Sequence, residues 1–350
     1  MSEGSVGLTL APERRWRAAL TTSDSPWERV GRDSPAVSVV IPVPPGSSLA
    51  TMSARLGGLA VSAARFELLV ARGNSPSAQR NAAVQEARGE YILFLDDDSE
   101  PMPGLLDLYR AVLEDDPAIG AVGGPAVPRA DGVFQRVTAL LLGETLVMGR
   151  SAARYRSMGG VRSTDEREVI LCNMAIRRRA FLDVGGFDES LYPNEENEFL
   201  ERLTHAGHRV VYHPEAVVHR PQWKTVGRLL RKVFTYGRGR AAQMRRRMSG
   251  VSASRLALAF GLPLVAGGSF GACAGGGLAG LFAAPGLYAL FLLVVAARLY
   301  RRGGLAAAAL SPIVTFLVHG GYGVGVLAGL VWPVRRTACG ITVKRLRGVR

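Results

Sequence analysis

The stretch "GEYILFLDDDSEPMPG" (residues 89–104) decides the fold. Its apolar and aromatic run, 91–95, leads directly into three consecutive aspartates, Asp96, Asp97 and Asp98. A short apolar run that stops at turn-forming residues is typical of a buried β-strand. Like charges at such short range repel and raise one another's pKa, so a divalent cation or water has to compensate the cluster.

Further strand and helix patterns alternate around this stretch. Buried-strand patterns occur at "VSVVIP" (37–42), "RFELLVA" (65–71) and "IGAVGGPAV" (119–127), and helical patterns at "SAQRNAAVQEA" (77–87) and "GLLDLYRAVLED" (104–115). This alternation predicts an α/β fold, with a mostly parallel sheet and helices on both faces. Ligands in such sheets bind beyond the carboxyl ends of the strands, which is where the three aspartates are expected.

Charge is distributed unevenly along the chain. The 350 residues include 43 Lys and Arg and 29 Asp and Glu, a formal net charge of +14. No acidic residue follows Glu215, whereas the rest of the chain is rich in arginine. This asymmetry indicates a second half that faces something anionic, either nucleic acid or a membrane surface.

Two long uncharged runs, 256–297 and 305–332, decide between these partners. About 20 apolar residues are needed to cross the hydrocarbon core of a bilayer. The first run is long enough for a helical hairpin, interrupted by glycines at 275–277, and the second for one tilted span. We therefore predict a membrane domain and no nucleic-acid partner.

The first 36 residues are polar and mixed in charge, and are expected to form a mobile leader without a secretory signal. The three cysteines, Cys172, Cys273 and Cys339, are scattered, which argues against a disulfide framework or a zinc site. The first half of the chain is therefore expected to remain in the cytoplasm.

The aspartates after the strand at 91–95 predict a cation site. In an extended chain, Asp96 and Asp98 project to the same side. Carboxylate oxygens suit Mg²⁺ or Mn²⁺, which in turn bridge the phosphates of a substrate. The alternative is an acidic surface turn without a ligand.

A second acidic cluster, Glu195, Glu196 and Glu198, lies at a predicted helix start. Acidic residues in a first helical turn are ordinary partners of the helix dipole, and this explanation suits Glu198. Either Glu195 or Glu196 is a candidate general base near the cation. His219, at the end of a later extended segment, is by itself more typical of a structural histidine than of a ligand.

The order and spacing of these segments resemble those of family 2 glycosyltransferases, which have the GT-A fold and use nucleotide-sugars. The resemblance covers residues 37–220. It rests on "VSVVIP", "PSAQRNAAVQEARGEYILFLDDD", "CNMAIRRRAFLDVGGFDESL", "EENEFLERL" and "HPEAVVHR". "YGRGRA" (236–241) and "HGGYGVGVLAGL" (319–330) are similar to segments of membrane-anchored members.

The resemblance implies a role for several residues of the donor site. Asp96 and Asp98 would hold Mg²⁺ or Mn²⁺ and, through it, the diphosphate, with Asp97 between them. Arg80 matches the arginine that contacts the nucleotide, and His219 matches a histidine that completes metal coordination in some members.

On the acceptor side, the resemblance implies that Glu196 is the catalytic base, with Arg202 at the position of an arginine six residues later. The implied reaction is a single displacement with inversion, which moves a sugar to a lipid-linked or membrane-proximal glycan such as a cell-envelope polysaccharide. Two alternatives are transfer to a polyprenyl phosphate, which needs no strong base, and a non-catalytic membrane scaffold.

Two departures from the family pattern affect specificity. The family commonly carries an aspartate that reads the nucleotide base, but "PVPPGSS" (42–48) and "LLVARGN" (68–74) lack it. The resemblance still implies a UDP-sugar as the donor, but no residue of these segments specifies the base. "QMRRR" (243–247) lacks the tryptophan of processive synthases.

The predicted organisation places the chain in the inner membrane, multi-pass, with a cytoplasmic catalytic domain. It comprises a leader (1–36), the GT-A domain (37–220), a basic juxtamembrane segment (221–252), two to three transmembrane helices (253–334) and a basic tail (335–350). Three spans would put the tail outside, against the positive-inside tendency. The last apolar run is therefore re-entrant, or the tail is an exception.

Overall fold

The computed structural model describes residues 35–47, 52, 55–61, 65–246, 278–332 and 341–347. Two predicted segments lie outside the described residues: the leader (1–36) except its last two residues, and the first apolar run from residue 256 up to residue 277.

An eight-stranded sheet forms the centre of the molecule, in the order β11-β2-β1-β3-β8-β5-β9-β7. Its strands are β1 (Val37–Val43), β2 (Phe66–Arg72), β3 (Tyr91–Leu95), β5 (Ile119–Gly123), β7 (Arg162–Thr164), β8 (Asn173–Arg177), β9 (Arg209–Tyr212) and β11 (Thr342–Arg347). Strand β1 pairs in parallel with β2 and β3, and β5 with β9, whereas β7, β8 and β11 run antiparallel to their neighbours. The predicted α/β class is confirmed, as a mixed sheet.

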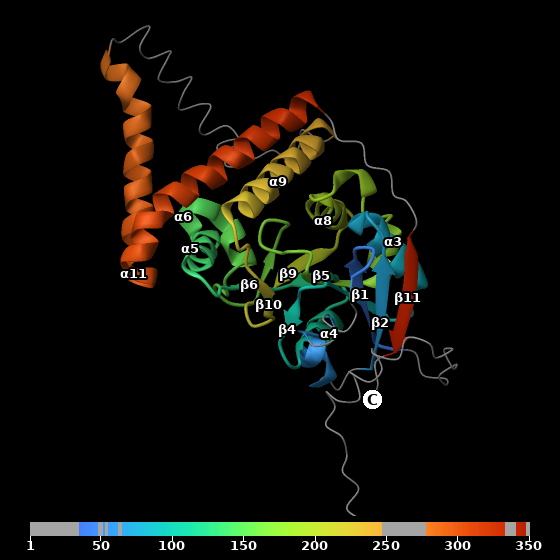
Figure 1. The fold of residues 1–350 in the computed structure, drawn as a ribbon. Coiled ribbons are helices and arrows are strands. Elements are labelled where there is room, and N and C mark those ends of the chain that lie inside the picture. The colour runs from blue at the N-terminus through green and yellow to red at the C-terminus, as the bar shows by residue number, and fades with distance from the viewer. Residues whose placement is uncertain are drawn as a thin grey trace, which may run out of the picture.

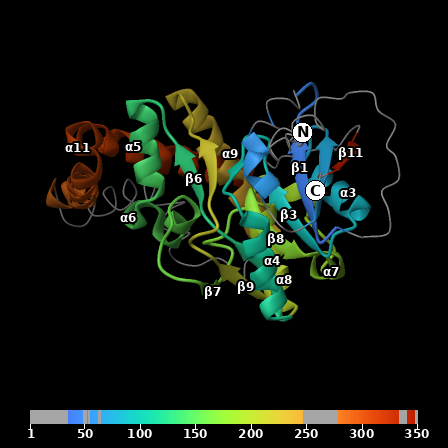
Figure 2. The ribbon, with the colours of Figure 1, turned by 90° about the horizontal axis from the view of Figure 1, so that it is seen from below.

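Helices cover both faces of this sheet. The α-helices of the described residues are α3 (Pro76–Glu86), α4 (Leu105–Asp115), α5 (Val133–Leu142), α6 (Thr145–Met148), α7 (Arg178–Asp183), α8 (Glu195–His205), α9 (Val226–Arg246) and α11 (Leu278–Val331). Three 3-10 helices are η1 (Leu56–Val61), η2 (Gly149–Arg154) and η3 (Glu189–Leu191). Figures 1 and 2 show α4 on one side of the strands and α3 on the other.

The fully buried strands β1, β2 and β3 supply the core on both faces, as expected for continuous apolar runs in a covered sheet. On one face Leu93 packs with Tyr109 of α4; on the other, Phe94 packs with Phe199 of α8 and its neighbours. Phe94, Phe181, Phe187 and Phe199 form an aromatic cluster with ring centroids 5.0 to 5.8 Å apart. This packing fixes the start of α8 beside the end of β3.

A small second sheet lies next to the carboxyl end of β3, in the order β4-β10-β6. Its strands are β4 (Glu100–Pro101), β10 (Val218–Pro221) and β6 (Ala126–Arg129). Because β4 follows the three aspartates almost immediately, β10 is brought beside them from more than a hundred residues away.

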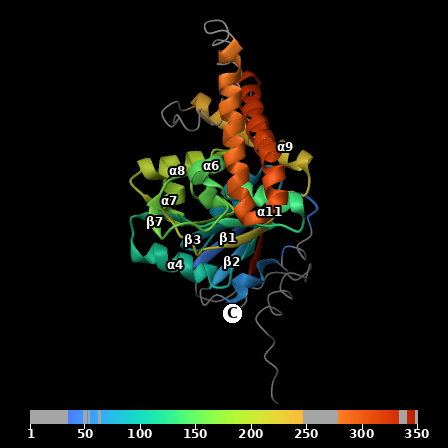
Figure 3. The same ribbon diagram turned by 90° about the vertical axis from the view of Figure 1, so that its left-hand side faces the viewer.

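Helix α11 is broken at Gly304, whose φ of 66° and ψ of −161° are not helical. We name residues 278–303 the first arm and residues 305–331 the second arm. The second arm lies along α9 on the body of the molecule, whereas the first arm projects away from it (Figures 1 and 3). Residues 285–331 are long and apolar enough to span a membrane, and they are the one such segment in the part of the chain that the structure describes.

Strand β11 was not predicted. The sequence indicates only a basic tail over 335–350, but residues 342–347 return to the central sheet and pair antiparallel with β2 (Figure 1). The described part of the tail is therefore an edge strand of the central sheet.

Candidate active site

The aspartate cluster is held by a tight turn at the end of β3. The backbone N–H of Asp96 donates to Ser99 Oγ at 3.0 Å, and the Ser99 N–H donates to the Asp96 carbonyl at 3.0 Å. Ser99 is fully buried, whereas Asp96, Asp97 and Asp98 are partly exposed. The carboxylates therefore project from a rigid turn at the carboxyl edge of the sheet.

Arg220, at the end of β10, joins the first and third aspartates. Its Nη2 lies 2.8 Å from Asp98 Oδ1 and 3.2 Å from Asp96 Oδ2, and its Nη1 lies 3.1 Å from the Cys172 Sγ. Arg220 is not among the site residues predicted from the sequence. The available signal was its position at the end of the "HPEAVVHR" motif, immediately after the predicted ligand His219.

Arg80 connects the aspartate cluster to the acidic start of α8. Its Nη2 lies 2.7 Å from Asp96 Oδ1, and its Nη1 lies 3.1 Å from Glu195 Oε1. Arg80 is 5% exposed and projects from α3, which covers the helical pattern that the sequence predicts over 77–87 except its last residue. The predicted nucleotide-binding arginine and aspartates thus belong to one network, Glu195–Arg80–Asp96–Arg220–Asp98.

The aspartates differ in their electrostatic surroundings. Burial favours protonation of Asp96, but the charges of Arg220, Arg80 and Lys232 outweigh it and hold the pKa of Asp96 below its ordinary value. Burial, with the like charges of Asp98 and Asp96, raises the pKa of Asp97. The outer aspartates therefore have positive partners, whereas burial and the repulsion of its two neighbours dominate at the middle one.

The two adjacent glutamates at the start of α8 have different partners. Glu195 is 1% exposed, and burial together with the charge of Glu196 raises its pKa to about 7, against the opposing effect of Arg80. Glu196 is 7% exposed, and its nearest cation is Arg154, with Nη1 3.6 Å from Glu196 Oε1. Arg154 also donates to Asn197 at 2.6 Å, so its link to Glu196 is long and shared.

Glu198 and Arg202 form a separate pair one turn further along α8. Arg202 Nε lies 2.6 Å from Glu198 Oε1, and Arg202 Nη2 donates to the Gly186 carbonyl at 2.6 Å. Gly186 has a φ of +70°, a conformation that favours glycine. This pair therefore fixes the glycine turn before α8.

His219 is not brought to the aspartate pair. Successive side chains of a strand point to opposite faces, so His219 faces away from the side to which Arg220 projects. Its charged neighbours are Arg129 and Glu100; burial and Arg129 lower the pKa of His219. No three His, Cys, Asp or Glu side chains gather as a metal-binding group in the described part of the chain.

Helix α9 lies next to the site, on the acidic start of α8. Asn194 Nδ2 donates to Gln243 Oε1, and a Cβ on Gly239 would lie 3.0 Å from Pro193 Cδ. Burial raises the pKa of Tyr236, on the same helix, and the nearby charge of Glu196 adds to this effect. Part of the basic segment assigned from the sequence to lipid contact therefore faces the active site.

The residues present fit a divalent cation. Arg220 contacts both Asp96 and Asp98, so one positive group already lies within reach of two carboxylates on a fixed turn. Oxygen donors of this kind are the ligands that Mg²⁺ and Mn²⁺ prefer. Arg220 occupies the position of the compensating partner that the sequence predicts to be a divalent cation or water.

Comparisons with known proteins agree with this architecture. Residues 60–185 match the family model for glycosyl transferase family 2. A solved structure of the mannosyltransferase PcManGT from Pyrobaculum calidifontis, in complex with GDP-Man and Mn²⁺, has a TM-score of 0.53 at 17% identity. The match covers 91% of this chain and 93% of that one, and confirms the GT-A-like α/β fold.

Two curated relatives match about half of this chain. A pre-mycofactocin glycosyltransferase from Mycobacterium tuberculosis is 30% identical over 172 residues, which are 48% of this chain and 34% of the relative. The succinoglycan biosynthesis protein ExoA from Rhizobium meliloti is 32% identical over 170 residues, which are 47% of this chain and 48% of the relative. The chain thus matches a third to a half of the length of these relatives.

Proposed function

We propose that this chain transfers a sugar from a nucleotide-diphosphate sugar to an acceptor hydroxyl, because residues 60–185 match the family model for glycosyl transferase family 2. One observation carries the proposal: Arg80 joins Asp96, at the end of β3, to Glu195, at the start of α8. The carboxylates proposed to bind the donor are thereby held close to the start of α8, which contains the proposed base Glu196. Both lie at the carboxyl edge of the sheet, where ligands bind in such folds.

Asp96 and Asp98 would hold Mg²⁺ or Mn²⁺ in the active enzyme. When bound, the cation supplies positive charge against the diphosphate that leaves. The charges of Arg220 and Lys232 lower the pKa of Asp96, so both residues add positive charge near this carboxylate. Arg220, whose planar guanidinium is suited to phosphate oxygens, would donate to the diphosphate when Asp96 and Asp98 hold the cation.

Glu196 accepts the proton of the attacking hydroxyl in the proposed reaction. The acceptor oxygen forms a bond to the anomeric carbon, the bond from that carbon to the diphosphate breaks, and the configuration inverts. Glu195 is less suited to the base role because Arg80 already binds one of its oxygens within a nearly closed environment. We assign Glu195 to positioning Arg80, and thereby Asp96.

The proposed acceptor is a lipid-linked or membrane-proximal glycan, and the proposed donor is a UDP-sugar. Support for a membrane location comes from the apolar α11 and from the absence of acidic residues after Glu215. In the proposed arrangement, the site lies beside α9, next to the segments that would meet the inner membrane (Figure 1). The catalytic domain would then face the cytoplasm, where nucleotide-sugars are made.

A nucleotide-sugar panel against the full-length protein, purified in detergent, tests the proposal. We expect slow release of the nucleoside diphosphate from one donor class with Mn²⁺ or Mg²⁺, and none with a chelator. Asp98→Asn should reduce donor affinity at least tenfold while thermal unfolding in detergent stays similar, because the side chain is partly exposed. Donor binding that is unaffected by both chelator and Asp98→Asn would refute the assignment of the site.

A further inference from the structure

Arg154 lies between the proposed base and a segment of chain that precedes β8. Its Nε donates to the Arg167 carbonyl at 3.0 Å, and its Nη2 donates to Asn197 Oδ1 at 2.6 Å and to the Glu166 carbonyl. Its Nη1 faces Glu196, at 3.6 Å from Oε1. A planar guanidinium that is held at Nε and Nη2 has little freedom to rotate, so the direction of Nη1 is fixed as well.

The distance between Arg154 and Glu196 suits a partner that orients the carboxylate. A separation of 3.6 Å is too long for a hydrogen bond, but the two opposite charges attract each other at this distance. Because Glu196 is 7% exposed, water and salt screen this attraction less than at the surface. Arg154 therefore restricts the carboxylate without occupying it through a hydrogen bond.

The position of Arg154 is set by the helix to which it belongs. Arg154 is the last residue of η2, and the neighbouring Ala153 is buried, with its carbonyl accepting from Tyr212 Oη at 3.0 Å. Near the start of the same helix, Arg150 Nε lies 2.9 Å from Glu168 Oε1. A displacement of η2 would therefore displace the guanidinium that faces Glu196.

Helix η2 continues directly from α6, and the N-terminal cap of α6 is bound to the first arm of α11. The cap is Glu144, which is fully buried; its Oε1 lies 3.0 Å from Arg298 Nη2 and its Oε2 lies 3.0 Å from Arg302 Nη1. Leu299, beside Arg298, is buried in a cluster that includes Val147 of α6. A buried carboxylate left without its partners is costly, so the two arginines hold α6 on the arm.

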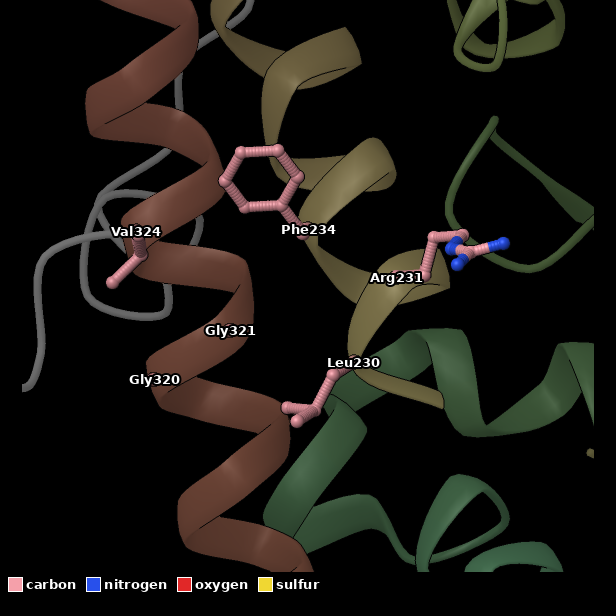
Figure 4. Close-up of a pocket in the computed structure, with 6 residues that line it drawn as sticks. All are labelled: Leu230, Arg231, Phe234, Gly320, Gly321 and Val324. Atoms are coloured by element: carbon pink, nitrogen blue, oxygen red, sulfur yellow. The ribbon is translucent and has the colours of Figure 1, made fainter. Parts of the chain in front are cut away.

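The second arm of α11 holds the other helix that approaches the start of α8. A Cβ on Gly237 of α9 would lie 2.3 Å from the Tyr322 carbonyl oxygen, so the backbones of the two helices are in close contact. A pocket of about 370 Å³ lies along the same seam (Figure 4). Through Gln243, α9 is hydrogen-bonded to Asn194, the residue before α8. Helix α11 thus contacts two elements that meet the acidic start of α8.

We propose that Arg154 is a positioning residue for Glu196, and that α11 sets its position through Glu144 and residues 145–154. Donor binding, which is assigned to Asp96, Asp98 and Arg80, is then independent of the first arm, whereas turnover depends on the arm being docked on the body. A misplacement of about 1 Å in an active site can cost a factor of about 10² in rate. The inference rests on Glu196 as the base of the proposed function.

Substitutions of Arg154 test the first link in the full-length protein, purified in detergent. We expect Arg154→Gln to lower kcat by about 10- to 100-fold while the KM for the donor stays within about twofold. Arg154→Lys should be intermediate, because it keeps the positive charge near Glu196 but not the planar fork. Arg150→Gln is the matched control on the same helix, because the partners of Arg150 are Asp165 and Glu168 rather than residues of α8.

Three results would overturn the role of Arg154. They are an unchanged kcat in Arg154→Gln, an equal loss of kcat in Arg150→Gln, and a loss of UDP binding that parallels the loss of turnover. The second and third results would show that the substitution loosens the fold generally. Calorimetric titration with UDP measures binding on the donor side separately from turnover.

The link to α11 is tested by removing the ion pairs of Glu144. Arg298→Gln and Arg302→Gln are combined with Glu144→Gln, so that no buried charge is left without a partner. Arg301→Gln is the control, because it removes a charge from the same part of the arm and leaves both ion pairs of Glu144 in place. We expect kcat to fall in the triple variant and to stay unchanged in the control, with the same donor KM in both.

Amide hydrogen exchange gives a second readout of this link that needs no donor. The N–H groups of Tyr155 and Arg156 both donate to the Ala152 carbonyl at 3.1 Å, so their exchange reports on the end of η2. We expect this exchange to be about tenfold faster or more in the triple variant, and unchanged in Arg301→Gln. Unchanged exchange in the triple variant would overturn the proposal. A chain that is inactive towards every donor would refute the proposed function, and the exchange would still decide whether α11 holds η2.

Discussion

Glu195 and Glu196 are neighbours in sequence, but they project about 100° apart on α8 and meet different groups. Glu195 binds Arg80 in a closed environment, whereas Glu196 has one long contact, to Arg154. We expect Glu196→Gln to fold, to bind donor and to lose turnover by about 10²–10⁴, the usual effect of removing a general base. Glu195→Gln should keep most of its turnover, because the amide oxygen still accepts from Arg80.

Turnover measured beside donor binding in both variants checks this assignment. The reverse pattern, with donor binding intact in each, would move the base to Glu195. Turnover retained in both variants would instead favour the phosphate acceptor, which needs no strong base.

The raised pKa of Glu195 predicts a dependence of stability on pH. Burial raises this pKa to about 7, above the value of about 4.3 for a glutamate in an unfolded chain. Between these values the native state binds the proton more tightly than the unfolded state, so the free energy of unfolding falls as pH rises from about 4.5 to about 7. In Glu195→Gln this fall should be smaller, by on the order of a few kcal/mol.

Thermal unfolding of the detergent-purified protein across this pH range measures the effect. Glu189→Gln is a matched control, because Glu189 is an exposed acid outside the network. If the free energy of unfolding depends on pH in the same way in the unsubstituted protein and in Glu195→Gln, the prediction is wrong.

At the residue scale, the sequence predicted which residues belong to the candidate site better than it predicted the contacts between them. Asp96 and Asp98 follow a buried strand, and Arg80 follows a helix start, so local pattern and family motif were sufficient to find them. Arg220 could not be predicted in the same way, since its contact with the aspartates depends on the β4–β10 pairing. The orientation of His219 depends on the same pairing, and the motif alone does not specify which face of the strand it occupies.

At the scale of elements, the contact between α9 and the second arm depends on glycine. We expect Gly237→Ala to lower the thermal stability of the protein in detergent by about 1–3 kcal/mol, because its methyl group would collide with the Tyr322 carbonyl oxygen. Gly227→Ala, on the same helix, is the control, since nothing lies within 4 Å of its added methyl group. An equal effect of the two substitutions would show that this helix contact is not close-packed.

The helices and the parallel strands could be predicted because their apolar periodicity is local. Strand β11 could not, because its sequence "TVKRLR" has four hydrophilic side chains in six and its partner lies at the far end of the chain. Lysine and arginine are common on edge strands, where they discourage further pairing. Read alone, however, these charges indicate only a solvated tail.

At the scale of the whole molecule, two modes of membrane attachment predict different responses to salt: insertion of α11 into the bilayer, and electrostatic attraction of the basic segment to its surface. At 1 M salt the Debye length is about 3 Å, so a chain held only by its basic segment would be released. We expect this protein to remain in the membrane pellet through a 1 M salt wash and a carbonate wash, and to be extracted by detergent. Release by salt alone would contradict insertion of the first arm.

The position of β11 also sets an order of events during translation. The ribosome makes β2 early, and the partner that covers its outer edge emerges only after the arms of α11. Until then β2 presents the unpaired backbone groups that make open edges prone to aggregation. A nascent chain that fails to enter the bilayer would hold its last strand away from this edge. In the proposed membrane location, membrane targeting would therefore be coupled to completion of the sheet, and a stalled chain would carry an open strand that chaperones and proteases can recognise.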